Sequence, residues 1–172
     1  MIYKVRVIAD IQEDVARDIA IRSSANLEDL HNIIINTFGF DGTEMASFYK
    51  ADDEWNQGEE IPLYDISEES SDISKTMKDF SLSDLFEHQE DKLIYVYDFF
   101  SMWTFLVELI EITNYDNEQD LPKVLYSLGN LPTEAPEKQF ESDKLEDGFD
   151  MYDDDNDDDD FLQSYEDDIN LN

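Results

Sequence analysis

The sequence contains no cysteine, which excludes disulfide frameworks and thiolate metal sites. Its two histidines, His31 and His88, are too few to assemble a histidine-rich metal site. The five glycines are scattered and form no phosphate-binding loop, and no Gly-x-Ser-x-Gly turn presents a nucleophilic serine. These absences predict a chain with no cofactor and favour one that is not an enzyme.

Basic residues are also scarce, because 11 Lys and Arg stand against 45 Asp and Glu, for a net charge of -34. That charge repels nucleic-acid phosphates and anionic lipid surfaces, so direct binding to nucleic acid or membrane is disfavoured. Residues 141–172 hold 15 of the acidic groups and one lysine, which leaves 30 acidic and 10 basic groups in residues 1–140. The part of the chain expected to fold is therefore acidic by itself, at -20, and a protein partner is expected to be basic.

No uninterrupted apolar run approaches the roughly 18 residues that a membrane-spanning helix needs. The densest apolar stretch, residues 92–112, carries Lys92, Asp98, Glu108 and Glu111 inside it or at its ends. Residues 1–10 have a strand pattern and lack the apolar core of a signal peptide. We therefore expect a cytoplasmic protein.

The stretch 92–112 predicts a β-hairpin at the centre of the fold. Apolar residues lie on both faces of its first half, as a central strand requires. In its second half every other residue from Trp103 to Leu109 is apolar, which predicts a second strand with one buried face. The segment from Asp98 to Met102 is the predicted turn between them.

The remaining chain predicts one main helix and several further strands. Asn26 as N-cap and Gly39 just past the end delimit a helix with one apolar stripe. The other expected elements are a first hairpin in residues 1–22 with its second arm at 18–22, strands at 46–51 and 60–64, a short helix at 81–86 and an amphipathic helix at 121–128. Pro62 assigns the strand at 60–64 to an edge of the sheet. The predicted fold is α+β, with a mixed, mainly antiparallel, β-grasp-like sheet that carries one main helix.

Composition divides the chain into one domain at residues 1–136 and an acidic tail at residues 137–172. The tail cannot bury enough apolar surface to offset about 1–2 kcal/mol of backbone ordering entropy per residue, so disorder is predicted. Apolar residues nevertheless alternate with acid in it, which suits a segment that folds on a basic partner. The candidate contacts are Phe149, Tyr152, Phe161, Leu162 and Tyr165. The alternative is a tail that only keeps the domain soluble.

Four carboxylates of the tail match ligand positions 1, 3, 5 and 12 of an EF-hand calcium loop. They are Asp155, Asp157, Asp159 and Glu166. An aspartate-rich segment matches these positions in several registers, and Asp160 stands where the loop requires glycine. Weak cation binding is the expectation here, and a true EF-hand is disfavoured.

Residues of the main helix and of the hairpin follow a family pattern. In the helix these residues are Leu30, His31, Ile34, Phe38 and Gly39, and in the hairpin they are Tyr95, Tyr97, Asp98, Phe99 and Trp103. In this order they resemble the plasmid pRiA4b ORF-3-like family over roughly residues 1–112. That family consists of microbial α+β domains without an assigned activity. The resemblance implies a candidate ligand site formed by Arg17, His31, Tyr97, Asp98 and Trp103.

The chain departs from the family pattern mainly at polar positions. Only Arg17 remains of a Trp-Arg-Arg element, and Phe40 replaces a tryptophan. Phe100 and Ser101 replace Gly-Asp, and Phe105 replaces a histidine. The resemblance therefore implies the fold more firmly than a chemistry.

The polar candidates also have structural explanations. His31 suits a partly buried structural histidine on the main helix, and His88 is expected to be solvated. Asp98, at the end of a central strand and flanked by aromatic residues, is the best acid–base candidate. However, aspartate commonly caps a turn through its backbone, and this explanation is preferred.

We therefore expect a non-enzymatic protein-interaction module whose acidic, aromatic tail engages a basic protein surface. Two alternatives stay open. One is a small-ligand-binding or enzymatic domain that uses Asp98 and Trp103 of the hairpin. The other is an acidic mimic of nucleic acid that occupies a DNA-binding protein.

Overall fold

The computed structural model describes residues 1–66, 75–114 and 120–136. The predicted acidic tail, with its aromatic and cation-binding candidates, lies outside these residues. The described elements are β1 (Ile2–Ala9), β2 (Ala16–Arg22), α1 (Leu27–Phe38), β3 (Ala46–Ala51), β4 (Gln57–Pro62), the 3-10 turn η1 (Met77–Asp79), α2 (Leu82–Leu85), β5 (Lys92–Tyr97), β6 (Trp103–Thr113) and β7 (Lys123–Leu128).

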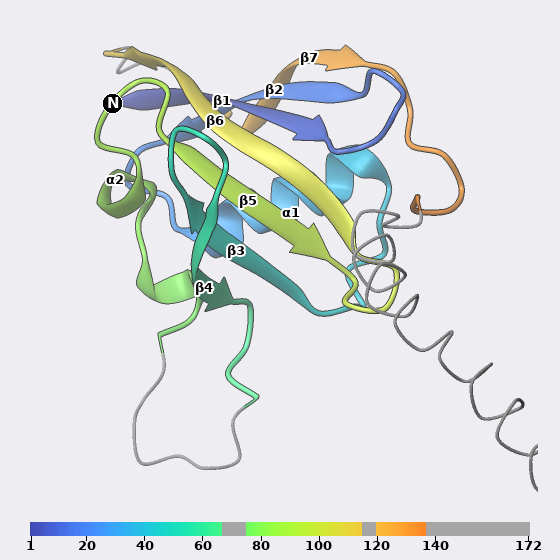
Figure 1. The fold of residues 1–172 in the computed structure, drawn as a ribbon. Coiled ribbons are helices and arrows are strands. Elements are labelled where there is room, and N and C mark those ends of the chain that lie inside the picture. The colour runs from blue at the N-terminus through green and yellow to red at the C-terminus, as the bar shows by residue number, and fades with distance from the viewer. Residues whose placement is uncertain (67–74, 115–119, 137–172) are drawn as a thin grey trace, which may run out of the picture. The chain divides into compact units, whose positions relative to one another are not determined.

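The seven described strands form one sheet in the order β4-β3-β5-β6-β1-β2-β7 (Figure 1). The predicted hairpin of residues 92–112 is confirmed as β5 and β6, and the 11-residue β6 is the central strand. Each pairing between the described strands is antiparallel, so the expected mixed sheet is corrected to an antiparallel one. In the described part of the chain α1 is the only helix longer than four residues, so the fold is richer in sheet than predicted.

Helix α1 begins and ends where the local sequence signals predict. The Asn26 side chain accepts a hydrogen bond from the Asp29 backbone N–H at 2.9 Å, and the Asp29 carboxylate accepts one from the Asn26 N–H at 3.0 Å. This capping box satisfies two amides that the first turn leaves without partners. Gly39 ends the helix with a φ of 81°, a left-handed conformation that glycine adopts without steric cost.

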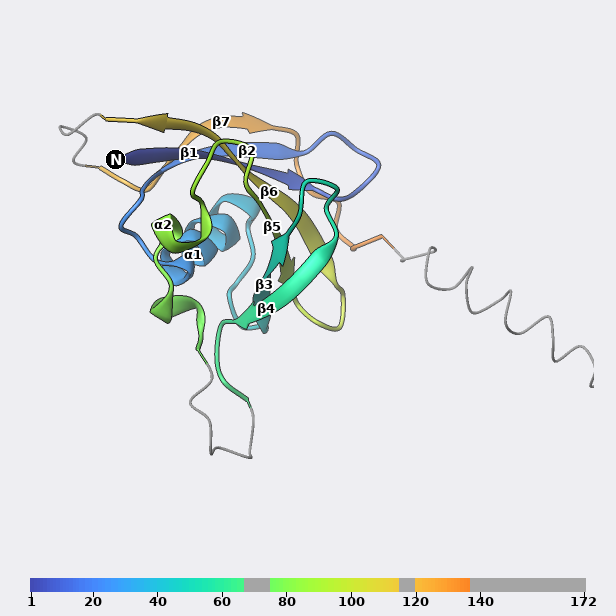
Figure 2. The same ribbon diagram turned by 60° about the vertical axis from the view of Figure 1, so that its left-hand side comes forward.

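Helix α1 packs against one face of the sheet, which we call the inner face (Figures 1 and 2). The core lies between them and consists of alternate strand residues together with Leu27, Leu30 and Ile34 of the helix. From the sheet it includes Tyr3, Val5, Val7, Ile19, Ile21, Phe48, Leu93, Tyr95, Tyr97, Trp103, Phe105, Val107 and Leu109. The intervening strand residues form the outer face.

Residues 121–128 form no helix, so that prediction is wrong: residues 123–128 are strand β7. Leu121, Val124, Leu125 and Leu128 have helical spacing, but Val124, Tyr126 and Leu128 also alternate as strand residues do. Residues 123–128 form a strand rather than a helix because their backbone pairs with β2 from Ala16 to Ala20.

Two other boundaries differ from the prediction. The second arm of the first hairpin starts at Ala16 rather than at residue 18. The edge strand predicted at 60–64 lies at Gln57–Pro62, and Pro62 is its last residue. The assignment of this strand to an edge is confirmed, because β4 pairs only with β3 among the described strands.

No helix in the described residues is long and apolar enough to cross a membrane.

Candidate functional site

Asp98 closes the turn between β5 and β6. Its carboxylate accepts hydrogen bonds from the backbone N–H groups of Phe100 at 3.1 Å and Ser101 at 3.3 Å. Its own backbone has a φ of 62° and accepts a bond from the Met102 N–H at 2.6 Å. Asp98 therefore has the structural role of a turn cap, which explains an aspartate here without a ligand.

Tyr97 binds the loop that follows α1. Its hydroxyl donates to the Asp41 carboxylate at 3.1 Å and accepts from the Gly42 backbone N–H at 3.1 Å. Burial is the main factor that raises the pKa of Tyr97, so the hydroxyl stays protonated at neutral pH. Phe40 stacks on the Tyr97 ring with a centroid distance of 4.3 Å and lies 5.7 Å from the Trp103 ring.

His31 is buried between α1 and the sheet, where it makes a hydrogen bond with Tyr95. Its Nδ1 lies 2.7 Å from the Tyr95 hydroxyl, and the two rings are 5.8 Å apart. Burial lowers the pKa of His31 to about 4, so the imidazole is neutral at neutral pH. Burial also raises the pKa of Tyr95, which keeps its hydroxyl protonated. The pair is a neutral buried hydrogen bond between α1 and β5.

Arg17 is a buried charge that links three elements. Its Nη1 donates to the carbonyl oxygens of Ala16 at 2.8 Å and Leu128 at 2.9 Å, and its Nε donates to the Thr37 hydroxyl at 3.2 Å. Its guanidinium lies 4.8 Å from the centre of the Phe38 ring. Arg17 thus joins β2 to β7 and to the end of α1.

Four of the five predicted site residues meet around one aromatic cluster centred on Phe105. Phe38, beneath the Arg17 guanidinium, lies 4.7 Å from Phe105. Tyr95, the partner of His31, lies 5.9 Å from it, and Phe40, which touches Tyr97 and Trp103, lies 6.1 Å from it. Asp98 stands apart, because its carboxylate faces the backbone of its own turn.

This cluster is a packed core rather than an open site. Phe105 is fully buried, and it stands where the family pattern has a histidine, so an apolar ring fills the centre. No buried polar side-chain atom in the described residues lacks a hydrogen-bond partner, and no cluster of three metal-ligating side chains occurs among them. The polar side chains of Arg17, His31 and Tyr97 therefore hold the surrounding elements of the core in place by hydrogen bonds.

A pocket of about 320 Å³ lies elsewhere, between β3, β5 and residues 84–91, and sequence reasoning missed it. Its charged lining has structural partners. The Asp91 carboxylate accepts from the backbone N–H groups of Glu87 and His88, at 2.7 and 2.8 Å, and Lys50 is paired with Glu59 at 2.8 Å. His88 is exposed, as expected. The lining residues come from segments that are separated in the sequence, so no short sequence motif predicts this pocket.

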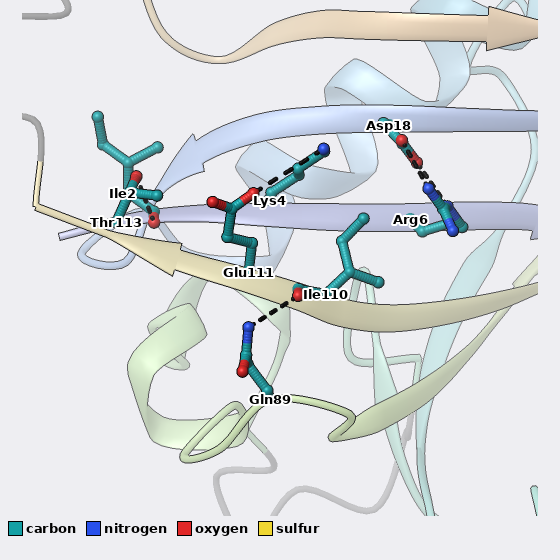
Figure 3. Close-up of polar contacts among 8 residues, drawn as sticks. All are labelled: Ile2, Lys4, Arg6, Asp18, Gln89, Ile110, Glu111 and Thr113. Atoms are coloured by element: carbon teal, nitrogen blue, oxygen red, sulfur yellow. Dashed lines mark hydrogen bonds and ion pairs between the residues drawn. The ribbon is translucent and has the colours of Figure 1, made fainter.

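The outer face carries ion pairs in register across the strands. Arg6 donates to both carboxylate oxygens of Asp18, at 2.8 and 2.9 Å, and Lys4 lies 3.9 Å from Glu111 (Figure 3). The strand pairing sets Lys92, Glu108, Arg6 and Asp18 side by side, which we call the charged row. Lys92 lies 3.6 Å from Glu108 within it. Neighbouring charges in this row alternate in sign.

Apart from Met1, Tyr64 and Ile66, the exposed large apolar side chains of the described residues lie in two places. Phe100, at the tip of the β5–β6 turn, is 97% exposed, and Phe99 beside it is also exposed. On β7 the exposed residues are Val124, Leu125, Tyr126 and Leu128. The sequence signal for the second place was present in residues 123–128, but their assignment to a helix concealed the exposed strand.

The model of the family described as plasmid pRiA4b ORF-3-like protein matches residues 1–169. This match extends past the resemblance over residues 1–112 and includes β7. A search of curated proteins finds no match. The crystal structure of a protein of unknown function, MM3350 from Methanosarcina mazei Go1, is similar, with a TM-score of 0.61 and 20% identity over 73% of this chain and 68% of that chain. This likeness shows a shared fold, and the family match over nearly the whole sequence shows that the chain belongs to the plasmid pRiA4b ORF-3-like protein family.

Proposed function

We propose that this chain is a cytoplasmic, non-enzymatic protein-interaction module whose acidic and aromatic tail engages a basic protein surface. The observation that carries the proposal is the net charge of -34, combined with apolar side chains that alternate with acid in residues 141–172. Acidic groups attract a basic surface over long distances, and buried aromatic rings supply most of the contact energy once the surfaces meet.

The contacts of the family-signature residues support this proposal over a ligand site at the hairpin. The Asp98 carboxylate accepts hydrogen bonds within its own turn, and His31 makes a hydrogen bond with Tyr95. Arg17 donates to carbonyl oxygens and lies over an aromatic ring. Each of these groups already has the partner that it needs in the folded domain. Ligand binding at the hairpin would have to break such contacts, which costs free energy for every polar group left unpaired.

The experiment compares two forms of the chain against one purified partner. Proteins captured by the full chain from a native lysate are identified, and the partner is then titrated with the full chain and with a chain that lacks residues 141–172. We expect the deletion to weaken binding and rising salt to weaken the full chain more than the deleted one. Exposed charges are screened over about 8 Å at physiological ionic strength, so salt acts on the charged tail contacts.

The aromatic part of the interaction needs its own variant. Phe161→Ala with Tyr165→Ala is expected to weaken binding at both salt concentrations, because it removes apolar contact area and leaves every charge in place. The control is Gln163→Ala with Asn170→Ala, which changes two polar tail residues without removing charge or a ring. A partner affinity that depends on neither salt nor these rings contradicts the proposal.

An acidic mimic of nucleic acid is the second candidate, favoured by the net charge of -20 in residues 1–140. A mimic presents negative charge on its folded surface to a DNA-binding protein. It therefore predicts that duplex DNA competes with the chain for the partner and that deletion of residues 141–172 leaves most of the affinity. The interaction module predicts the opposite dependence on the tail.

A further inference from the structure

Strand β7 forms one edge of the sheet and pairs, among the described strands, with β2 alone. Its large apolar residues are exposed: Val124 by 37%, Leu125 by 48%, Tyr126 by 55% and Leu128 by 42%. An edge strand offers a row of N–H and C=O groups to any extended chain that approaches it. Such an edge is ordinarily protected by charge, proline or a covering element.

The opposite edge of the same sheet is protected in that way. β4 carries Glu59 and Glu60 and ends at Pro62, which has no N–H to donate. β7 has no proline and a single charged residue, Lys123, at its first position. The two edges therefore differ in whether a further strand is discouraged.

The register brings two rows of the outer face to β7. Leu128 lies opposite Ala16 and continues an apolar row through Ile8, Leu106 and Ile94. Tyr126 lies opposite Asp18, at the end of the charged row. A strand added beside β7 would place its outer side chains next to Tyr126 and Leu128 and so lengthen both rows.

We propose that the edge of β7 binds an extended, basic segment of a partner protein, which adds to the sheet as a further strand. The inference rests on the proposed function and specifies where and how the partner is held. Backbone hydrogen bonds to β7 supply the affinity, and contacts of alternate side chains with Tyr126 and Leu128 supply selectivity.

Charge favours a basic partner segment at this edge over a second copy of the chain and over the chain's own tail. A second copy of the chain brings another net charge of -34 to the edge, and its pairing is opposed by repulsion. Residues 141–172 of the same chain bring 15 acidic groups to a part of the chain that is already at -20. A segment rich in lysine or arginine is attracted instead, and its aliphatic stems cover apolar surface.

The test uses a defined probe with the full chain. The probe is a peptide of about ten residues in which lysine and valine alternate, a length typical of a strand. Its matched control carries an N-methyl group on each internal residue, which removes the N–H donors of both edges and keeps every charge and side chain. We expect the control to bind about tenfold more weakly or worse, since it loses several backbone hydrogen bonds. The parent peptide is expected to slow amide exchange in residues 123–128, and equal affinities of the two peptides overturn the proposal.

A pair of variants tests the position of the edge. Val124→Lys with Tyr126→Lys places like charge on β7, and Phe100→Lys with Ile66→Lys makes the same charge change at exposed residues outside it. We expect the β7 pair to weaken the peptide about tenfold more than the control pair, because repulsion then acts at the docking edge itself. Equal weakening by the two pairs means that only net charge matters and overturns the proposal. The comparison of the two peptides uses the unsubstituted chain, so it remains decisive if β7 loses its pairing in the variant.

The remaining outcomes separate this proposal from the proposed function. If the chain without residues 141–172 still binds the parent peptide more tightly than the methylated control, the edge of β7 binds the peptide independently of the tail, which supports the proposal. If that deletion abolishes binding and the full chain binds both peptides with equal affinity, the tail is the binding element and the proposal for β7 is overturned. Stronger binding on deletion assigns the edge to the chain's own tail, and a dimer that disappears in the β7 variant assigns it to a second copy. Either of these results overturns the proposal.

Discussion

The inner and outer faces of the sheet use their polar groups differently. On the inner face three polar side chains have specific hydrogen-bond partners: Tyr95 for His31, Asp41 for Tyr97, and backbone carbonyl oxygens for Arg17. On the outer face the charged groups form a row of alternating sign, in which Arg6 bonds Asp18 and Lys92 lies near Glu108. The residues that carry the family pattern thus lie mainly on the face that packs.

This difference has an energetic consequence. A buried polar group that loses its partner pays a desolvation penalty, whereas an exposed ion pair contributes at most about 1 kcal/mol, because water screens it. Changes on the inner face should therefore destabilise the domain in proportion to burial. Changes at exposed outer-face residues and in the tail should act mainly on partner binding instead. A series of substitutions tests this ranking.

The largest effect is expected for Phe105→Ala at the centre of the aromatic cluster. Phe105 is fully buried, and removing its ring leaves a cavity, which costs about 3–5 kcal/mol of the free energy of unfolding. Phe100→Ala changes the same residue type in the same hairpin, where the ring is 97% exposed, and should cost less than about 0.5 kcal/mol. Denaturant titration measures both. Similar losses in the two variants would contradict the assignment of the inner face as the core.

A pH-dependent loss is expected from His31. Its pKa is about 4 in the folded domain against about 6.5 in an unfolded chain, so the unfolded chain binds the extra proton between these values. The stability contributed by neutral His31 is complete above about pH 6.5 and falls as the pH drops towards 4, by up to about 3 kcal/mol. The many carboxylates also titrate in this range, so the measured quantity is the difference from a variant. His31→Asn keeps a polar atom near Tyr95 and removes the titration.

The control for this prediction is His88→Asn, which removes the exposed histidine. We expect the stability of that variant to follow the unsubstituted protein from pH 7 to pH 4. A difference between the His31 variant and the unsubstituted protein that stays constant with pH would show that His31 is not buried as a neutral base.

Arg17→Met should cost about 1–3 kcal/mol, because it leaves the carbonyl of Leu128 without its side-chain donor and removes the charge above Phe38. The loss should be local, with faster amide exchange in β7 than in β4. Arg17→Lys retains the charge but cannot donate from two nitrogens in a fixed plane, so it should recover only part of the loss. Full recovery by lysine would assign the effect to charge alone.

The sequence predicted those elements whose signals are local. Asn26 and Gly39 delimit α1 by their own capping, and alternation from Trp103 to Leu109 predicts β6. β7 escaped prediction because its apolar residues satisfy both helical and strand spacing, and the edge of β2, about 100 residues earlier in the chain, decides between them. The antiparallel pairing of the strands likewise depends on contacts between segments that are far apart in the sequence.

The sequence pattern named five candidate site residues, and the structure places four of them around one core cluster. Arg17, His31, Tyr97 and Trp103 do converge, yet their burial around Phe105 depends on how α1 crosses the sheet. Asp98 was correctly interpreted as a turn cap, since that role depends only on neighbouring residues. The charged row could not be predicted, because Arg6 and Asp18 face each other only in the observed register.

Asp18→Asn on the outer face should have a small effect on stability. The Asp18 carboxylate is buried and makes a two-point contact with Arg6, whose side chain is 43% exposed, so removing the Asp18 charge should cost about 1 kcal/mol. Glu111→Gln is the matched control, because its contact with Lys4 is longer, at 3.9 Å, and should contribute nothing measurable. Raising the salt concentration should narrow the difference between the two variants. A loss of about 3 kcal/mol, the upper end of the range expected for Arg17→Met, would erase the distinction between the faces.

Deletion of residues 141–172 should have the smallest effect on stability. These residues supply no periodic apolar face to the core, and their 15 acidic groups repel a domain that is already at -20. The free energy of unfolding should therefore change by less than about 0.5 kcal/mol, and repulsion predicts that any change is a gain at low salt. Thermal and denaturant unfolding of the full and deleted chains at two salt concentrations measures this. A loss of stability comparable to that of Phe105→Ala would show that these residues pack against the domain. The tail would then have a role in stabilising the fold rather than in binding a partner.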